Sequence, residues 1–132
     1  IDNMDDPYSV GLGFAVRLDK AGDFIGKQAC IERKANGRYT HRLVQIFLRD
    51  PEPQMIHQEI VLRNGIPVGD VRAASYGHTL GGSVGLAMVA GDPVDAAYLN
   101  EGTWEVDIAG RIYPAVVSLK PMYDPGMEKI KA

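Results

Sequence analysis

The chain has 132 residues, of which 45% are hydrophobic and 23% are charged, and this balance is typical of one globular domain with its own core rather than of a disordered segment. Its formal charge of −3 provides no basic field for nucleic acid or for an anionic membrane surface, so we expect neither as a partner. The single cysteine, Cys30, excludes an internal disulfide and a multi-cysteine metal site, and its apolar neighbours predict an inert, buried thiol.

The start of the sequence shows no pattern of a targeting or membrane segment. No apolar run approaches the roughly 18 residues of a membrane helix, and no charged and then apolar stretch resembles a signal peptide. The chain begins at Ile1 rather than at a methionine, so we expect it to be a piece of a longer protein.

The first third of the chain predicts a short lead-in to the main domain. Residues 1–9 are polar and acidic and include Pro7, which is typical of a linker or a frayed terminus. Apolar and polar residues alternate over 14–18, which is the period of a half-buried strand. Asp23 is placed to cap a helix that contains the apolar residues after it and stops at Gly37.

From Arg42 onward the pattern changes to strands. We expect strands at residues 43–48, 60–62, 66–74, 84–89, 103–108 and 112–119, while the segment 94–99 is ambiguous and is compatible with one turn of helix. The Asn64-Gly65 pair between two apolar runs is the strongest short signal for a hairpin, and Ala109-Gly110 marks another. Trp104 lies on an alternating strand and is expected to anchor the core.

These elements favour a mainly β fold, an antiparallel, Greek-key-like β-barrel of six or seven strands with one short N-terminal helix. Closure into a barrel removes the exposed edges that so many short strands would otherwise present. We expect the barrel domain to occupy residues 10–126, with a lead-in strand and helix at 10–40, a linker at 1–9 and a tail at 127–132.

The stretch 69–89, GDVRAASYGHTLGGSVGLAMV, places a cluster of polar side chains between two apolar strands. Its glycines permit a tightly folded loop, and such loops often carry function. The stretch lacks the lysine and the long following helix of a phosphate cradle, and no base or set of metal ligands accompanies it. We therefore expect no self-contained active site in this stretch and no catalytic residue on this chain.

Two further groups of residues could carry chemistry. His57 and Glu59 would share one face of a strand, as in a metal site, but without a third ligand a solvent-exposed pair is favoured, and we expect no metal. The basic group within residues 33–42 is offset by Glu32 and favours a solvated face, with an anion-binding patch as the alternative.

Four motifs follow one another in a specific order. They are Gly11-Leu12-Gly13-Phe14 with Asp23-Phe24-Ile25-Gly26-Lys27, then Arg42-Leu43-Val44, then the stretch from Gly69 to Ala87, and finally Pro121-Met122-Tyr123-Asp124-Pro125. Together they resemble the C-terminal domain of the glycine-cleavage aminomethyltransferase (T-protein) family, over about residues 8 to 126. The Tyr76-Gly77-His78-Thr79 form resembles the branch that is fused to FAD-dependent dimethylglycine and sarcosine dehydrogenases.

The resemblance implies a role within a longer protein. The parent enzyme would oxidise an N-methylated glycine on FAD and pass the one-carbon unit to tetrahydrofolate. The preceding domains, which are the expected partners of this chain, would contain the FAD, the catalytic aspartate and most of the folate cavity. The barrel would close the folate pocket and be catalytically silent on its own, in the cytoplasm or the mitochondrial matrix.

Two residues, Phe14 and Arg42, match family positions that face folate. Phe14 corresponds to an aromatic residue that packs on the rings of the cofactor. Arg42 corresponds to an arginine whose guanidinium binds the carboxylate of the glutamate tail, and Tyr123 is a third candidate. The alternatives are a core strand residue for Phe14, an exposed charge for Arg42 and core packing for Tyr123.

The sequence is compatible with three other functions. The chain could belong to a stand-alone glycine-cleavage aminomethyltransferase without an FAD domain, or to a non-enzymatic folate-binding or assembly module. A nucleic-acid-binding barrel is the third, and the negative charge of the chain disfavours it.

Overall fold

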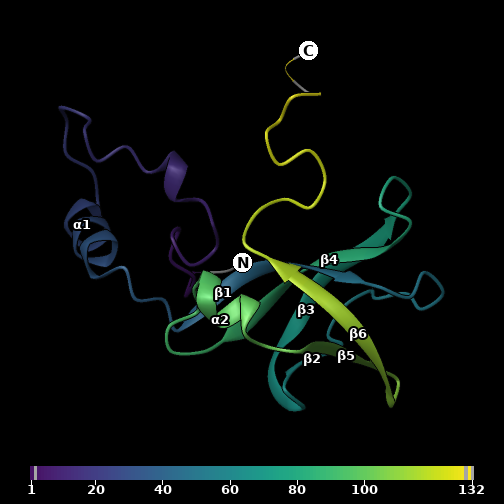
Figure 1. The fold of residues 1–132 in the computed structure, drawn as a ribbon. Coiled ribbons are helices and arrows are strands. Elements are labelled where there is room, and N and C mark those ends of the chain that lie inside the picture. Colours follow the sequence, from purple (N-terminus) through teal and green to yellow (C-terminus); the bar gives the residue numbers. More distant parts are fainter. Residues whose placement is uncertain (2, 130, 132) are drawn as a thin grey trace.

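The computed structural model describes residues 1, 3–129 and 131. It consists of a β-barrel with two appendages, an N-terminal lead-in whose helices stand away from the barrel and a C-terminal segment that leaves it after the last strand (Figure 1). In chain order the elements are the 3-10 helix η1 (Gly13–Ala15), α1 (Lys27–Asn36), β1 (His41–Leu48), β2 (Ile60–Arg63), β3 (Ile66–Gly77), β4 (Gly82–Ala90), α2 (Ala96–Asn100), β5 (Trp104–Ile108) and β6 (Arg111–Ser118).

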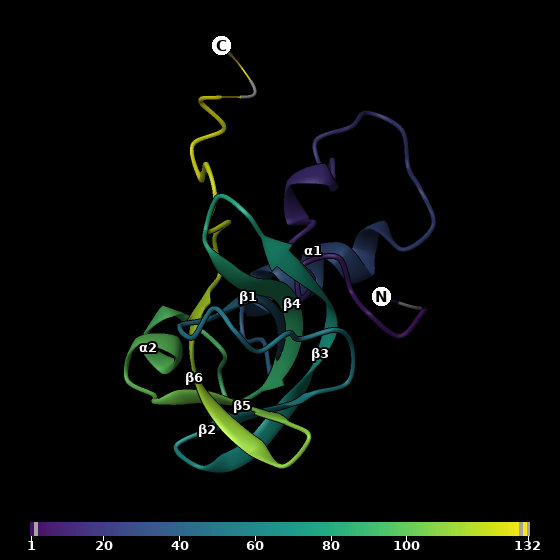
Figure 2. The same cartoon turned by 90° about the vertical axis from the view of Figure 1, so that its right-hand side faces the viewer.

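The six strands close into a barrel in the order β1-β4-β3-β2-β5-β6, and Figure 2 shows them curling around a common interior. Hairpins join β2 to β3, β3 to β4 and β5 to β6. The other pairs, β1–β4, β1–β6 and β2–β5, join strands that are not consecutive in the sequence. All pairs are antiparallel, so the predicted mainly β, antiparallel barrel is confirmed, with six strands.

Alternation along the strands directs one set of side chains into the barrel. On β1 the inward residues Val44, Ile46 and Leu48 are fully buried, whereas the residues between them are only partly covered. Trp104, at the start of β5, is 5% exposed, and its indole Nε1 donates to the Leu99 carbonyl at 2.9 Å. The predicted core anchor is confirmed, and its polar edge is satisfied as burial of an indole requires.

The loop between β1 and β2 folds back over the core. Met55 is 1% exposed, and its backbone N–H donates to the buried Ser83 hydroxyl at 3.0 Å. The loop also bonds to β3, where the Gln58 N–H donates to the Val71 carbonyl at 2.7 Å. A proline-containing segment that cannot extend a sheet therefore covers the interior and contributes a large apolar side chain to it.

The stretch 69–89 forms the hairpin of β3 and β4. The sequence predicts that the first strand ends near residue 74, but β3 continues to Gly77 and β4 begins at Gly82. Between them the Leu80 and Gly81 N–H groups donate to the Gly77 carbonyl at 2.9 and 2.8 Å, and Gly81 has a φ of 77°, which favours glycine. The expected loop is thus a tight turn at the end of a long hairpin.

The predicted strand at 14–18 does not form. Residues 13–15 are the 3-10 helix η1 instead, and the Phe14 side chain is 83% exposed, so its interpretation as a core strand residue is wrong. A strand needs a partner, and a closed barrel has no free edge to offer one. Alternating residues alone cannot make a strand at this position.

The helix of the lead-in begins later than predicted. The Asp23 carboxylate does accept a hydrogen bond from the Phe24 N–H at 2.9 Å, but Gly26, with a φ of 86°, precedes the first helical residue, Lys27. The predicted stop at Gly37 is confirmed. None of the ten residues of α1 is buried, and Cys30 is half-exposed rather than buried because α1 does not pack on the barrel core.

At Gly69 the backbones of β3 and β4 approach each other closely. A Cβ added there would lie 1.9 Å from the Met88 carbonyl oxygen and 2.9 Å from the Val89 Cα, both backbone atoms of the paired strand. We expect Gly69→Ala to lower the free energy of unfolding by about 3 kcal/mol in urea denaturation, because neither strand can move without disturbing the ladder. Gly22→Ala is the control: nothing lies within 4 Å of its added Cβ, so its effect should stay within about 0.5 kcal/mol. Equal effects of the two substitutions would contradict this account.

Candidate functional site

Arg42 lies at the beginning of β1, where the lead-in joins the barrel. Its side chain is half-buried, and its Nη1 donates to the Val94 carbonyl at 3.3 Å. The guanidinium carbon lies 5.0 Å from the centre of the Tyr39 ring, within the range of a cation–π contact. A cleft of about 210 Å³ opens beside it, lined by Arg42 and by residues 36–39 and 93–95.

A second arginine, Arg33 on α1, also lies against Tyr39. Its guanidinium carbon is 4.7 Å from the ring centre. Its nitrogens donate to the Asp6 carboxylate at 3.1 Å, to the Ser9 hydroxyl at 3.0 Å and to the Arg38 carbonyl at 2.9 Å. Arg33 is therefore fully engaged in holding α1 to the first residues of the chain and to the turn before β1.

Asp6 is the anion at the centre of this junction. Its carboxylate accepts hydrogen bonds from the Ser9 hydroxyl and from the backbone N–H groups of Tyr8 and Ser9. Burial alone would raise the pKa of Asp6, but the hydrogen bonds from Ser9 and Arg33 outweigh burial and lower this pKa below its ordinary value.

Arg38 is paired as well, on the exposed side of the same cleft. Its Nε and Nη2 donate to the two carboxylate oxygens of Asp92 at 2.6 and 2.7 Å. This fork of hydrogen bonds raises the pKa of Arg38 and lowers that of Asp92. Asp92 itself is joined to Pro93 by a cis peptide bond.

Arg42 differs from Arg33 and Arg38 in its partners. Across the part of the chain that the structure describes, no carboxylate lies within ion-pair distance of its guanidinium. It contacts one backbone carbonyl and one aromatic ring, which orient the group without neutralising it. This arrangement can bind a carboxylate or another anion from outside the chain.

The other two predicted site residues lie on the appendages. Phe14 stands on η1 with 83% of its surface exposed. Tyr123 follows β6 and is 46% exposed, with the Lys129 ammonium 5.1 Å from its ring centre. Tyr123 is therefore not a core residue, and the segment that carries it is tied to β1 by the Met122 N–H, which donates to the Gln45 side chain at 2.8 Å.

The structure does not gather the three predicted residues into one pocket. Among residues 1, 3–129 and 131, no recorded hydrogen bond or ring contact joins Phe14, Arg42 and Tyr123. The residue that sequence reasoning missed is Tyr39, which contacts both Arg33 and Arg42. An aromatic residue within the basic group at 33–42 was the available signal.

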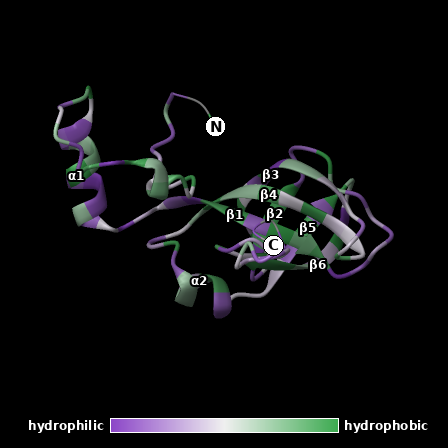
Figure 3. Cartoon of the chain, turned by 90° about the horizontal axis from the view of Figure 1, so that it is seen from above, coloured by the Kyte–Doolittle hydropathy of each residue, from purple (hydrophilic) through white to green (hydrophobic). Residues whose placement is uncertain are grey.

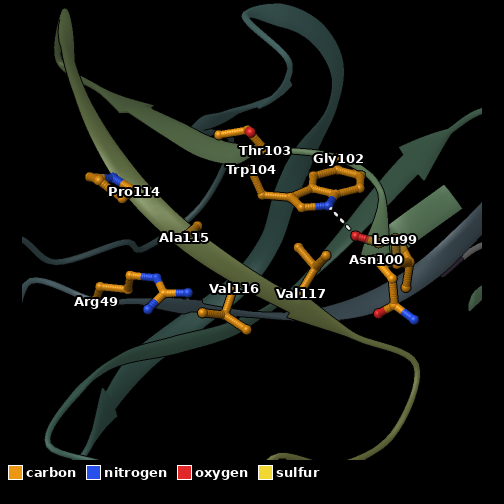
Figure 4. Close-up of a pocket in the computed structure, with 10 residues that line it drawn as sticks. All are labelled: Arg49, Leu99, Asn100, Gly102, Thr103, Trp104, Pro114, Ala115, Val116 and Val117. Atoms are coloured by element: carbon orange, nitrogen blue, oxygen red, sulfur yellow. Dashed lines mark hydrogen bonds between the residues drawn. The ribbon is translucent and has the colours of Figure 1, made fainter. Parts of the chain in front are cut away.

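A larger hollow lies between α2 and β6 and is shown in Figure 4. It has a volume of about 370 Å³ and is lined by Arg49, Leu99, Asn100, Gly102, Thr103, Trp104, Pro114, Ala115, Val116 and Val117. The one indole donor in it is already used by the Leu99 carbonyl (Figure 4). The hollow contains none of the predicted site residues and no pair of groups suited to acid–base chemistry, so it is not our candidate.

The remaining motifs contribute no reactive cluster. The Glu59 Oε1 accepts a hydrogen bond from the Ile56 N–H at 2.8 Å, while His57 is exposed. Tyr76 and His78 contact each other edge-to-face at 5.1 Å near the turn between β3 and β4. Within the described residues, no three side chains of the metal-ligating types come together. Within the same residues, no helix is long and apolar enough to cross a membrane.

Comparison with solved structures defines the class of domain. The glycine cleavage system aminomethyltransferase T from Bartonella henselae matches with a TM-score of 0.68 at 24% identity, over 86% of this chain and 31% of that chain. At this identity the likeness establishes the fold alone, an antiparallel barrel that forms one part of a longer polypeptide.

The sequence comparison identifies the family. The model of the glycine cleavage T-protein C-terminal barrel domain matches residues 41–124, from the first strand of the barrel to the segment after the last. The chain belongs to this family, as its four motifs predict.

Relatives come from two kinds of enzyme. The 4-methylaminobutanoate oxidase (formaldehyde-forming) of Paenarthrobacter nicotinovorans is 45% identical over 131 residues, which are 99% of this chain and 15% of the relative. Mitochondrial sarcosine dehydrogenase of Homo sapiens is 30% identical over 96% of this chain and 14% of its own length. The aminomethyltransferase of Nostoc sp. is 37% identical over 93% of this chain and 31% of its own length. The chain therefore spans less than a third of these relatives.

The Asp6 junction predicts a pH-dependent stability. Because the pKa of Asp6 is lowered in the folded chain, its contribution is complete above the ordinary carboxyl pKa of about 3.9 and is lost as the pH falls through the folded value. We expect Asp6→Asn to lower the free energy of unfolding by about 1 kcal/mol at neutral pH, since the junction is partly exposed to solvent. In urea denaturation this difference should shrink as the pH falls toward about 3.

Glu105→Gln is the control for this experiment, because Glu105 lies on β5, away from the junction. It should show no comparable difference between neutral and acidic pH. An Asp6→Asn effect that persists unchanged in acid would show that the carboxylate charge is not what holds α1.

Proposed function

We propose that this chain is the C-terminal domain of a longer, FAD-linked oxidoreductase that demethylates an N-methylated amino acid and transfers the one-carbon unit to tetrahydrofolate. The observation that carries the proposal is the 45% identity to a methylaminobutanoate oxidase across 131 residues. Sarcosine dehydrogenase and dimethylglycine dehydrogenase, at 30% and 34% identity, act by their names on substrates of the same kind. All three names describe a methylated amine that carries a carboxylate.

The proposed role of the chain is to complete a folate pocket formed mainly by other domains. The geometry that supports this role is the guanidinium of Arg42, which is oriented by Tyr39 and the Val94 carbonyl and has no acidic partner among the described residues. It would bind a carboxylate of the glutamate tail through charge-assisted hydrogen bonds. Phe14 and Tyr123 offer exposed aromatic faces for the pteridine and benzoyl rings.

We place no catalytic residue on this chain. When bound to the preceding domains, FAD would supply the two-electron oxidation of the amine and tetrahydrofolate would accept the one-carbon unit. The barrel would exclude water from the folate side and hold the tail of the cofactor. The relatives named as mitochondrial support a mitochondrial location for a eukaryotic parent, for which we propose the matrix, and for a bacterial parent we propose the cytoplasm.

A second candidate is supported by the aminomethyltransferase of Nostoc sp., of which this chain covers 31%. In that case the parent would be a shorter enzyme without FAD. The two candidates differ in a direct observation: the first parent carries a dinucleotide-binding Gly-x-Gly-x-x-Gly motif and a flavin absorption spectrum, and the second carries neither.

The activity test uses the full-length parent with sarcosine, dimethylglycine and 4-methylaminobutanoate. Reduction of a bound flavin by one of them would support the first candidate. Formaldehyde should then be released without tetrahydrofolate and suppressed when tetrahydrofolate is present. Flavin reduction with formaldehyde release that tetrahydrofolate does not change would remove the folate role and leave the oxidase role.

Arg42→Ala tests the proposed tail contact in the full-length parent. We expect tetrahydrofolate affinity, measured by calorimetry, to fall by about 1.5–3 kcal/mol, which is the worth of a hydrogen bond to a charged group. Arg111→Ala is the control, because Arg111 is exposed at the start of β6 and should leave the affinity unchanged. If Arg42→Ala leaves the tetrahydrofolate affinity unchanged, Arg42 is an exposed charge without a role in binding the cofactor.

The 132-residue chain on its own should bind tetrahydrofolate weakly or not at all. The reason is that Phe14, Arg42 and Tyr123 lie on three separate parts of the chain, and most of the proposed cavity belongs to other domains. Calorimetry with the chain alone checks this expectation. Micromolar affinity would show that the folate site lies on the barrel itself.

A further inference from the structure

The segment from Arg17 to Gly37, here called the arm, stands outside the barrel in both Figure 1 and Figure 3. Its helix, α1, contributes no buried residue. The barrel core is composed of strand residues, Met55 and residues near α2, and none of its members comes from the arm. The arm is therefore ordered without being part of the core that the rest of the chain shares.

Among the described residues, the helix of the arm is held to the rest of the chain mainly through Arg33. Arg33 is bonded to Asp6, Ser9 and the Arg38 carbonyl. Ile31 and Ala35 are four residues apart and so share a face of the helix, and both are exposed, Ile31 by 40%.

The turn that leads into the helix carries two more exposed apolar side chains. Phe24 is 36% exposed, and Ile25 is fully exposed. Together with Ile31 they place three large apolar side chains on a segment of about twenty residues. Such a concentration costs free energy in water and is typical of a surface that another structure covers.

The net charge of the arm is positive, opposite in sign to the net charge of the whole chain. Residues 17–37 contain five basic and three acidic residues, whereas the chain as a whole carries −3. Lys20, Lys27 and Lys34 flank the apolar residues. A partner that fits this surface would therefore present an apolar patch with an acidic rim.

The comparisons indicate where the partner lies. The family match to the barrel begins at residue 41 and leaves the arm out, yet the alignment to the methylaminobutanoate oxidase covers 99% of this chain and therefore includes the arm. The same relative is several times longer than this chain, which spans 15% of it. The arm thus accompanies the barrel in a longer protein without belonging to the barrel.

From these observations we propose that the exposed apolar residues of the arm, Phe24, Ile25 and Ile31, are the docking surface for the domain that precedes the barrel in the same polypeptide. The proposal rests on the chain being part of a longer oxidoreductase, and it adds which residues join the two parts. The contacts of Arg33 with Asp6, Ser9 and the Arg38 carbonyl fix the arm to the first residues of the chain and to the turn before β1. The arm then connects the two domains by an apolar contact to one and a polar contact to the other.

Hydrogen–deuterium exchange on the full-length parent and on the 132-residue chain tests the proposal. In the parent, the amides of α1 should exchange at least about tenfold more slowly than in the 132-residue chain, because docking must be lost before they open. The double substitution Ile25→Asp with Ile31→Asp should remove this protection in the parent. In the 132-residue chain the same substitutions should leave the denaturation midpoint unchanged, since both side chains are already exposed there.

Ile66→Asp is the matched control, because Ile66 is 65% exposed at the start of β3, on the barrel. It should leave the protection of α1 in the parent unchanged. If the double variant does not fold, the wild-type comparison and Ile31→Asp alone give the same readout.

Equal exchange of α1 in the wild-type parent and in the 132-residue chain would overturn the proposal. It would also be overturned if the 132-residue chain sediments as a dimer in which α1 is protected, since a second copy would then cover the surface. A parent that protects α1 but oxidises no N-methylated amino acid would keep the docking surface and remove the proposed activity. A parent that oxidises an N-methylated amino acid but does not protect α1 would keep the proposed activity and remove the docking surface.

Discussion

Strand β1 is paired along both of its edges, with β4 from His41 to Phe47 and with β6 from Gln45 to Leu48. This double pairing closes the sheet, and much of the remaining structure follows from the closure. The interior becomes a single apolar space that the loop carrying Met55 can cover. No edge of the barrel is left for a further strand, so the segments before β1 and after β6 must run outside the barrel as appendages.

The barrel was predictable because its signals are local. Alternation identifies β5, apolar runs indicate β1 and β6, and the Asn64-Gly65 pair places the turn between β2 and β3, where Asn64 has a φ of 53° and Gly65 of 77°. The prediction of a strand at 14–18 was wrong, because alternation indicates which residues suit a strand but not whether a partner strand is available. The predicted start of α1 was wrong for a local reason. Gly26 has a left-handed backbone conformation, so the helix begins only after it, at Lys27.

The candidate site was less predictable because its geometry depends on distant residues. The family resemblance pointed to Arg42, but the sequence did not predict that Arg42 lacks the acidic partners that its basic neighbours Arg33 and Arg38 have. That difference arises because Arg33 finds Asp6 twenty-seven residues away and Arg38 finds Asp92 fifty-four residues away. Sequence spacing gives no account of such pairings, and without them the basic group at 33–42 is only a cluster of positive charge.

The contact of Tyr39 with both Arg33 and Arg42 has a mechanical consequence. Arg33 belongs to the arm and Arg42 to the first strand of the barrel, and the two guanidinium groups lie against the same ring at 4.7 and 5.0 Å. Rotation of the arm relative to the barrel would displace the ring and change the direction in which the guanidinium of Arg42 points. The orientation of the arm relative to the barrel and the direction of one charged group are thereby coupled through a single phenol side chain.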